Sequence, residues 1–211
     1  HVQIIRIGTK VPAFNPFRIL NDPSLLEMFK TYSTGEKKIY IMAHFNHPRE
    51  LTPEAIEGLN LLMESGVSLV NQTPMVKGVN DDPEVLAELF SKLSYIGVPP
   101  YYVFLCRPTL GNETYSVPVE RGYEIFEKSR TLCSGLAKRG RLVMSHESGK
   151  IEVLGMSEDQ IFFKFLRAAD KINDARFMAF FRNPEACWFD DYQEASDEFS
   201  LFSQTVRAGC S

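Results

Sequence analysis

The stretch that decides the fold is KIYIMAHFNHPRELTPEAIEGLNLLMESGVSLVN, residues 38–71. It opens with an apolar run at 38–43 and closes with another at 67–71, and such runs of apolar, largely β-branched residues are typical of buried strands. Between them, Thr52-Pro53 marks the start of a helix, and Gly66 is a natural residue to follow its last turn. The stretch therefore predicts one strand–helix–strand unit.

The same unit recurs along the first two-thirds of the chain. Strands are predicted at residues 2–7, 38–43, 67–71 and 101–106, and helices are predicted to begin after Asp22, Thr52 and Asp82 and at Pro118. Continuous apolar strands that alternate with amphipathic helices indicate a parallel sheet covered by helices. Either an open doubly wound sheet or part of a TIM-like (β/α) barrel satisfies this α/β pattern.

The pattern changes near residue 140. RLVMS, KIEVLGM, QIFFKFL and FMAFF are short strand-like runs with few helical signals between them. We therefore predict two parts: residues 1–140, built from β/α units, and residues 141–211, a strand-rich extension. The extension ends in an acidic tail that contains Asp190, Asp191, Glu194, Asp197 and Glu198. Trp188 and Phe189 are expected to pack as a cap or an interface.

Composition excludes several classes of protein. The chain has 211 residues, a formal net charge of −4 and a pI of about 5.7. This balance argues against a dedicated binder of nucleic acid or of anionic membranes, which needs a basic excess. No apolar run approaches the ~20 residues of a membrane span. The four cysteines show no CxxC spacing, which disfavours a zinc finger, and free thiols fit a cytoplasmic protein.

Polar side chains follow the predicted strands at the point where each strand ends. The segments are Thr9-Lys10, His44–Pro48, Asn71–Pro74 and Cys106–Pro108. Because ligands of parallel α/β proteins bind at the carboxyl ends of the strands, these segments predict a shared site. The alternative is that strand ends are polar because they are partly exposed in any such protein.

The histidines and the cysteine at these ends, and one lysine further along the chain, allow more specific predictions. The His44 and His47 rings do not share a face at this spacing in an extended chain, so one histidine that binds a ligand is favoured over a metal site, with a structural imidazole as the alternative. Cys106 is interpreted as a buried thiol rather than a nucleophile. Lys150 follows a glycine turn, Ser148-Gly149, and a desolvated lysine held over a pocket is the type that forms Schiff bases.

Four segments occur in order along the chain: HVQIIRIG (1–8), HFNHP (44–48), NQTPMVKGVND (71–81) and PPYYVF (99–104). Together they resemble the lysine 2,3-aminomutase family of radical S-adenosylmethionine (SAM) enzymes over about residues 1–155. The resemblance implies a partial (β/α) barrel, a [4Fe–4S] cluster held by a CxxxCxxC loop, and pyridoxal 5′-phosphate (PLP) bound by a lysine. In that family the 5′-deoxyadenosyl radical abstracts hydrogen from a PLP-bound amino acid, and the amino group moves from C2 to C3.

The resemblance also implies roles for individual residues. By position it assigns cofactor binding to Arg6, Gly8, His44, Asn46, Gln72 and Lys150. His44 and Asn46 would lie on the SAM side, and Lys150 matches the catalytic lysine that binds PLP. The family has four glycines before that lysine, where this chain has Glu147-Ser148-Gly149.

Other departures change what the resemblance implies. No CxxxCxxC is present, so the cluster ligands are expected upstream of His1, and the chain alone is not expected to cleave SAM. Lysine-acting members follow the PYY strand with Cys-Asp, whose aspartate binds the substrate's ammonium group. Here the pair is Cys106-Arg107, and a second expected aspartate is replaced within 143–146. Arg107 would repel a lysine side chain and suits a carboxylate, so an amino acid other than lysine is the expected substrate.

Two further functions stay open at this point. One is a radical SAM relative that has lost PLP, which the altered glycine turn favours. The other is a non-catalytic binding domain derived from a barrel, because the cluster ligands are missing from the chain. For the enzyme, the expected partners are a small amino-acid substrate and further copies of the same chain, with no nucleic acid and no membrane.

Overall fold

The computed structural model describes residues 2–195. One sheet runs through this part of the chain, with its eight strands in sequence order. The strands are β1 (Ile4–Thr9), β2 (Lys38–Ala43), β3 (Ser68–Met75), β4 (Pro100–Leu105), β5 (Arg141–His146), β6 (Gly149–Met156), β7 (Gln160–Ala168) and β8 (Phe177–Phe181). Neighbours from β1 to β5 pair in parallel, and neighbours from β5 to β8 pair antiparallel.

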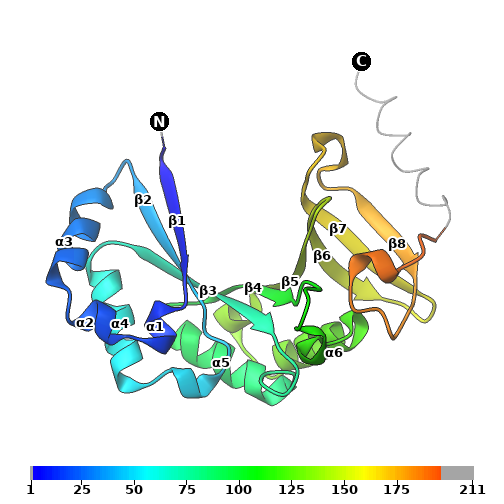
Figure 1. Ribbon diagram of the computed structural model, residues 1–211, viewed down its shortest axis with the longest axis horizontal. Helices are drawn as coiled ribbons and strands as arrows, with labels where there is room; N and C mark the ends of the chain where they lie inside the picture. The colour runs from blue at the N-terminus through cyan, green and yellow to red at the C-terminus, as the bar shows by residue number, and fades with distance from the viewer. Residues whose placement is uncertain (1, 196–211) are drawn as a thin grey trace.

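Helices cover the convex side of the curved sheet (Figure 1). The α-helices are α1 (Val11–Phe14), α2 (Phe17–Leu20), α3 (Pro23–Tyr32), α4 (Pro53–Glu64), α5 (Pro83–Tyr95) and α6 (Val119–Thr131). Short 3-10 helices are η1 (Pro48–Glu50), η2 (Glu113–Tyr115), η3 (Gly135–Lys138), η4 (Lys171–Asn173) and η5 (Phe189–Asp191). The parallel strands with helices outside form part of a (β/α) barrel, which confirms the predicted fold class.

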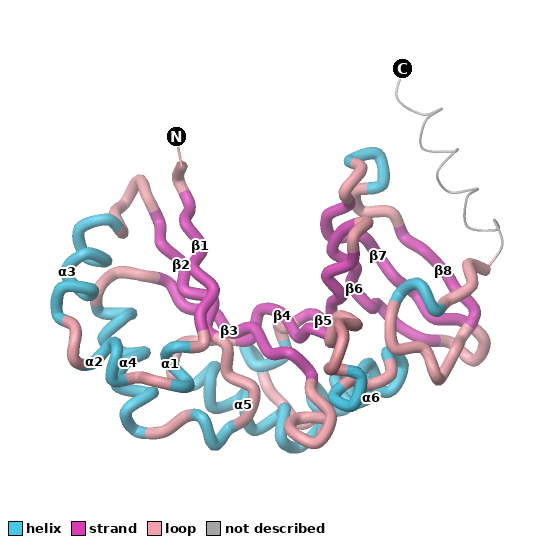
Figure 2. The backbone as a smooth tube through the Cα atoms, in the orientation of Figure 1, coloured by secondary structure: helices cyan, strands magenta, loops and turns pink. Residues whose placement is uncertain are grey.

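The sheet bends so that its two ends face each other. Figure 2 shows β1 and β2 rising on one side and β6 to β8 rising on the other, with β3 to β5 between them. Strand alternation gives the parallel sheet two different faces. Ile39, Ile41, Leu69 and Val103 point toward the helices and belong to the buried core. The residues between them face the concave side.

The sequence signals for helix ends are confirmed. The side chains of Asp22, Thr52 and Asp82 accept hydrogen bonds from the first-turn backbone of α3, α4 and α5, respectively. Gly66 and Gly97, which follow α4 and α5, have φ angles of 86° and 87°. A left-handed backbone of this kind favours glycine, and at both positions it lets the chain turn from the helix into the next strand.

The structure corrects several element boundaries. β3 was expected at 67–71 but continues to Met75, because polar residues in its second half pair with β4 and with a neighbouring loop. RLVMS belongs to a fifth parallel strand, β5, rather than to a changed pattern. The two short helices α1 and α2 were not predicted. The division into parts at residue 140 stays a prediction, since one sheet continues across it.

The extension is attached to the barrel through buried contacts. Glu120 of α6 is 3% exposed and accepts hydrogen bonds from the Arg182 side chain at 2.9 Å and the Asn183 backbone at 2.7 Å. Trp188 is buried, and Phe189 packs against the core, which confirms a packing role for both. Of the predicted acidic tail, Asp197 and Glu198 lie outside the described residues, as does Cys210.

No helix in the described part of the chain is both long and apolar enough to cross a membrane.

Candidate functional site

Four polar side chains that the sequence singled out lie on or beside the concave face. Register and alternation place Arg6 of β1, Gln72 of β3 and Lys150 of β6 on this face, while Arg107 follows β4. Among the described residues, none of these four side chains forms a hydrogen bond or an ion pair with another protein group. They are free to contact a ligand.

The amine of Lys150 lies over two aromatic rings. Its Nζ is 4.3 Å from the centre of the Tyr102 ring and 4.8 Å from that of Phe104. Burial, and secondarily the charge of Arg6, lower the pKa of Lys150 below its ordinary value. A lysine with a lowered pKa is more often neutral near pH 7, and a neutral amine is the nucleophilic form.

The influence of Arg6 on Lys150 reflects the curvature of the sheet. Four strands separate β1 from β6 in the sheet order, yet the two side chains are close enough to repel each other. A pair of cations that face one concave surface favours an anionic ligand between them. Gly8, two residues after Arg6, leaves open space, because a Cβ there would meet nothing within 4 Å.

The loop after β2 carries His44 and Asn46. Glu50 holds this loop, since its carboxylate accepts hydrogen bonds from Lys10 and from the Asn46 backbone, both at 2.6 Å. Burial, followed by the charge of Lys10, lowers the pKa of His44. The ring is therefore held in its neutral form. The side-chain oxygen of Asn46 is buried and has no partner among the described groups, so it is an acceptor available to a ligand.

Asn71 and Thr73 organise the same loop from the opposite side of β3. Asn71 is fully buried, and its amide bonds the Phe45 backbone at 2.8 Å and 3.1 Å and the Thr73 hydroxyl at 2.7 Å. The Thr73 hydroxyl also donates to the Phe45 carbonyl at 3.0 Å. The predicted convergence of all strand-end polar residues is thus only partly right. Along β3 the side chains alternate, so Gln72 faces the concave side while Asn71 and Thr73 face the helices.

Asn80 is a structural residue that sequence reasoning missed. It is fully buried, donates to the backbone carbonyls of Asn46 and Pro74, both at 2.9 Å, and accepts from Val76 at 2.7 Å. It therefore joins the loops after β2 and β3. Its position within NQTPMVKGVND was the only sequence signal for it.

His47 has a local structural role. Its Nδ1 accepts a hydrogen bond from the Arg49 backbone at 3.1 Å, and it caps the short helix η1 together with Glu50. Within residues 2–195, no group of His, Cys, Asp and Glu side chains is arranged to hold a metal ion. Between the two histidines, His44 is the one whose ring remains available.

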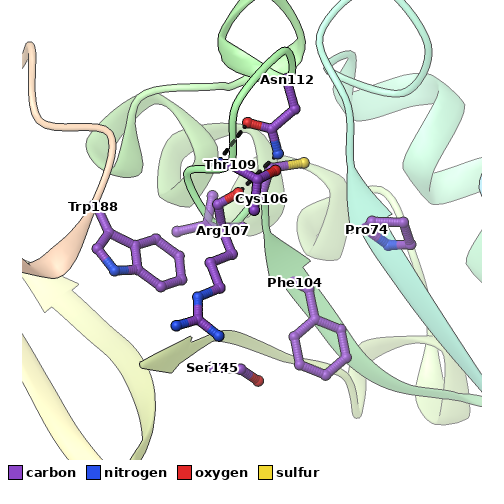
Figure 3. A pocket seen from close by; sticks show the side chains of 9 residues that line it. Pro74, Phe104, Cys106, Arg107, Thr109, Asn112, Ser145 and Trp188 are labelled. Atoms are coloured by element: carbon purple, nitrogen blue, oxygen red, sulfur yellow. Dashed lines mark hydrogen bonds between the residues drawn. The ribbon is translucent and has the colours of Figure 1, made fainter. Parts of the chain in front are cut away.

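Arg107 lines a cavity of about 350 Å³ at the end of β4. Figure 3 shows its guanidinium extending between Trp188 and Phe104, toward Ser145. The cavity joins parts of the chain that are distant in sequence, because Trp188 belongs to the extension and Phe104 to the barrel. Arg107 is its one charged lining residue within the described chain, so an anionic group is the natural polar ligand there.

Cys106, which also lines this cavity, is not activated. Burial raises the pKa of its thiol, and the sulfur donates to the Met75 carbonyl at 3.1 Å. A raised pKa reduces the thiolate that would act as a nucleophile. Cys106 is half-buried rather than buried, so the interpretation is right about its lack of activation but overstates its burial.

Comparisons with known proteins identify relatives over most of the chain. A protein of Aquifex aeolicus named "putative L-lysine 2,3-aminomutase" is 56% identical over 200 residues, which are 94% of this chain and 54% of that protein. The L-lysine 2,3-aminomutase of Clostridium subterminale is 42% identical over 64% of this chain and 31% of its own length. The glutamate 2,3-aminomutase of Clostridioides difficile is 35% identical over 71% of this chain and 34% of its own length.

The other comparisons add little. No family model matches the chain. A solved structure of a radical SAM methyltransferase from Sphaerobacter thermophilus is 17% identical and gives a TM-score of 0.42, over 57% of this chain and 38% of that one.

The chain spans about half the length of the Aquifex protein and about a third of the other two relatives. The identity of 56% extends over 94% of this chain, and the identity of 42% over 64% of it. The chain belongs to the lysine 2,3-aminomutase family.

Proposed function

We propose that this chain is the part of a radical SAM aminomutase that holds PLP and the substrate. The whole enzyme would move an amino group between C2 and C3 of a PLP-bound amino acid. The single observation that supports this most is the Lys150 amine, which is partly buried, forms no hydrogen bond or ion pair with the described residues, and shares a concave face with Arg6 and Gln72. The names of the relatives, lysine and glutamate 2,3-aminomutases, support the reaction class.

The residues present fit PLP. Lys150 would hold the cofactor through its amine, because burial and Arg6 both favour the neutral form that reacts with an aldehyde. Arg6 would attract the cofactor's phosphate, since it has no carboxylate partner in the described chain. The Tyr102 and Phe104 rings would contact the amine on one side, orient it and keep water away from that side. PLP, when bound, supplies a conjugated system that delocalises the electron left at the substrate.

The SAM side of the proposed site consists of His44, Asn46 and Gln72. A buried acceptor without a partner fits a donor group on a ligand, and the Asn46 oxygen is such an acceptor. His44, held neutral, can donate or accept one hydrogen bond without adding charge. The [4Fe–4S] cluster does not fit this chain, whose cysteines lack the required spacing, so its ligands would come from residues outside it.

Arg107 determines the proposed substrate class. Its guanidinium points into a largely apolar cavity beside Phe104, whose ring also contacts Lys150. A carboxylate on the substrate side chain would pair with it, whereas the ammonium group of lysine would be repelled. We therefore propose an acidic amino acid rather than lysine, consistent with the glutamate-acting relative.

The test is anaerobic preparation of the full-length protein with reconstituted iron and PLP. Release of 5′-deoxyadenosine and formation of β-amino acid are measured with L-glutamate and with L-lysine. Turnover of glutamate above lysine is expected, and Arg107→Asp should lower kcat/KM for glutamate about tenfold or more. Arg121→Asp, the same change on the exposed face of α6, is the control. Efficient lysine turnover by the unmodified protein would contradict the proposed substrate.

A radical SAM enzyme without PLP is the second candidate. The observation that favours it is Glu147-Ser148-Gly149 in place of the glycine run of the family. Release of 5′-deoxyadenosine by a protein that binds no PLP would support this candidate over the aminomutase.

A further inference from the structure

The turn that presents Lys150 is held from two sides. His146 pairs with Gly149, and Ser145 pairs with Lys150, in the hairpin between β5 and β6. Gly149 has a φ angle of 142°, and a Cβ there would lie 2.2 Å from the Arg167 carbonyl oxygen of β7. The backbone next to Lys150 is therefore fixed tightly against β7, and only glycine fits.

His146 closes the turn with a nearly buried ring. Its side chain is 7% exposed. Nδ1 accepts a hydrogen bond from the Ser148 backbone at 3.1 Å and lies 2.7 Å from the Ser148 hydroxyl. With Nδ1 occupied as an acceptor, the neutral ring carries its proton on Nε2. That atom lies 3.0 Å and 3.1 Å from the two carboxylate oxygens of Asp190.

Asp190, which contacts His146, lies 44 residues further along the chain. The preceding residues pack on the same ring, with Phe189 at 5.4 Å and Trp188 at 6.1 Å between ring centres. Trp188 also lines the Arg107 cavity. One histidine thus contacts the turn that carries the Lys150 amine and the segment that forms a wall of the neighbouring cavity.

We propose that His146 and Asp190 are positioning residues that fix the Lys150 turn relative to the Arg107 cavity. This inference rests on the proposed role of Lys150 as the lysine that binds PLP. The carboxylate of Asp190 orients the ring through Nε2, and the ring in turn fixes Ser148 through Nδ1. The segment that carries Trp188 and Asp190 therefore completes the site although it contributes no group that reacts.

A Ser–His–Asp array also suggests a nucleophilic serine, but the geometry disfavours it. The Ser148 backbone N–H already donates to Nδ1, the nitrogen that would have to take the hydroxyl proton. The three residues therefore stabilise the turn and do not form a nucleophilic triad.

The test is a PLP titration of the full-length protein, followed by the visible absorbance that appears when the Lys150 amine condenses with the PLP aldehyde and releases water. Asp190→Asn and His146→Asn are the test variants; the second keeps an acceptor for the Ser148 N–H but loses the contact with Asp190. Glu194→Gln is the matched control, because it removes another exposed ion pair, with Arg176 at 2.8 Å, from the same segment.

Both test variants should bind PLP about tenfold more weakly, and their double variant should bind no more weakly than either single variant. Asp190→Glu should restore part of the affinity, and Glu194→Gln should match the unmodified protein. Circular dichroism confirms that each variant is folded. If the PLP affinity of Asp190→Asn stays within twofold of that of the unmodified protein, the role of His146 and Asp190 is overturned, but the role of Lys150 is not. Failure of the unmodified protein to bind PLP would overturn the proposed role of Lys150 as well.

Discussion

The Lys150 amine lies 4.3 Å from the centre of the Tyr102 ring, so the group with the lowered pKa sits on an aromatic surface. The ring face attracts a cation, whereas burial and the charge of Arg6 favour the neutral amine. The ring contact and the burial therefore act in opposite directions on the protonation of this amine.

Arg6→Gln should raise the pKa of Lys150 toward its ordinary value, because it removes the cation that disfavours the ammonium form. The measurement is the pH dependence of reductive methylation of Lys150, followed by mass spectrometry. The midpoint is expected to move to higher pH. Arg18→Gln, the same change on the helix-covered side, is expected to leave it unchanged. An unmoved midpoint in Arg6→Gln would show that Arg6 does not act on Lys150.

Asn71→Ala should destabilise the protein by about 3–5 kcal/mol, because it leaves the buried N–H and carbonyl of Phe45 without their amide partner. Gln72→Ala is the matched control on the adjacent residue, whose side chain has no protein partner in the described chain. It should change the free energy of unfolding by less than about 1 kcal/mol. Urea unfolding of the two variants compares them. Equal losses in the free energy of unfolding would contradict a structural role for Asn71 and a binding role for Gln72.

Gly149→Ala should disrupt the hairpin before Lys150, since the new Cβ would overlap the backbone of β7 at Arg167. We expect a loss of more than about 3 kcal/mol in the free energy of unfolding. Gly111→Ala is the control: Gly111 has a φ angle of 87°, but a Cβ there meets nothing within 4 Å. It should cost only about 1 kcal/mol of backbone strain. Thermal unfolding checks both, and a tolerated Gly149→Ala would contradict the tight packing on β7.

Glu120→Ala should destabilise the attachment of the extension by about 3 kcal/mol or more, because it leaves Arg182 without its buried carboxylate. Glu124→Ala, which breaks the exposed pair with Arg121 on the same helix, should cost less than about 1 kcal/mol. Chemical unfolding measures both. Similar small effects would mean that Glu120 does not anchor the extension.

His44 should make stability fall as pH decreases. Its pKa in the folded protein is lower than the ordinary value of 6.5, so below that pH the unfolded chain takes up a proton that the folded protein does not. The unfolding free energy is expected to be insensitive to His44 above pH 6.5 and to decrease below it. His44→Gln should flatten this part of the profile. An unchanged slope in the variant would show that the ring is not held neutral.

Much of the scaffold could be predicted from the sequence because its signals are local. Asp22, Thr52 and Asp82 cap helices with their own side chains, and Gly66 needs a left-handed backbone, so short segments contain the necessary information. The fifth parallel strand was not separable from the extension. The residues RLVMSH fit a parallel or an antiparallel strand equally well; β6 follows directly in a hairpin, but the parallel neighbour β4 lies about 40 residues earlier in the chain.

The candidate site was predictable only in part. Gly8, Gln72 and Lys150 were named from motif positions, and the strand register then placed them on one face. The opposite roles of Asn71 and Gln72 depend on the face each residue takes, which requires the strand's register. The contact of His146 with Asp190 joins residues 44 positions apart, and no local pattern encodes it.

The most direct test of the central claim is to bind PLP to the full-length protein, reduce the adduct with borohydride and map the modified peptide by mass spectrometry. The account predicts one pyridoxyl phosphate group on Lys150 and none in Lys150→Ala. A modification on a different lysine, or none in the unmodified protein, would contradict it.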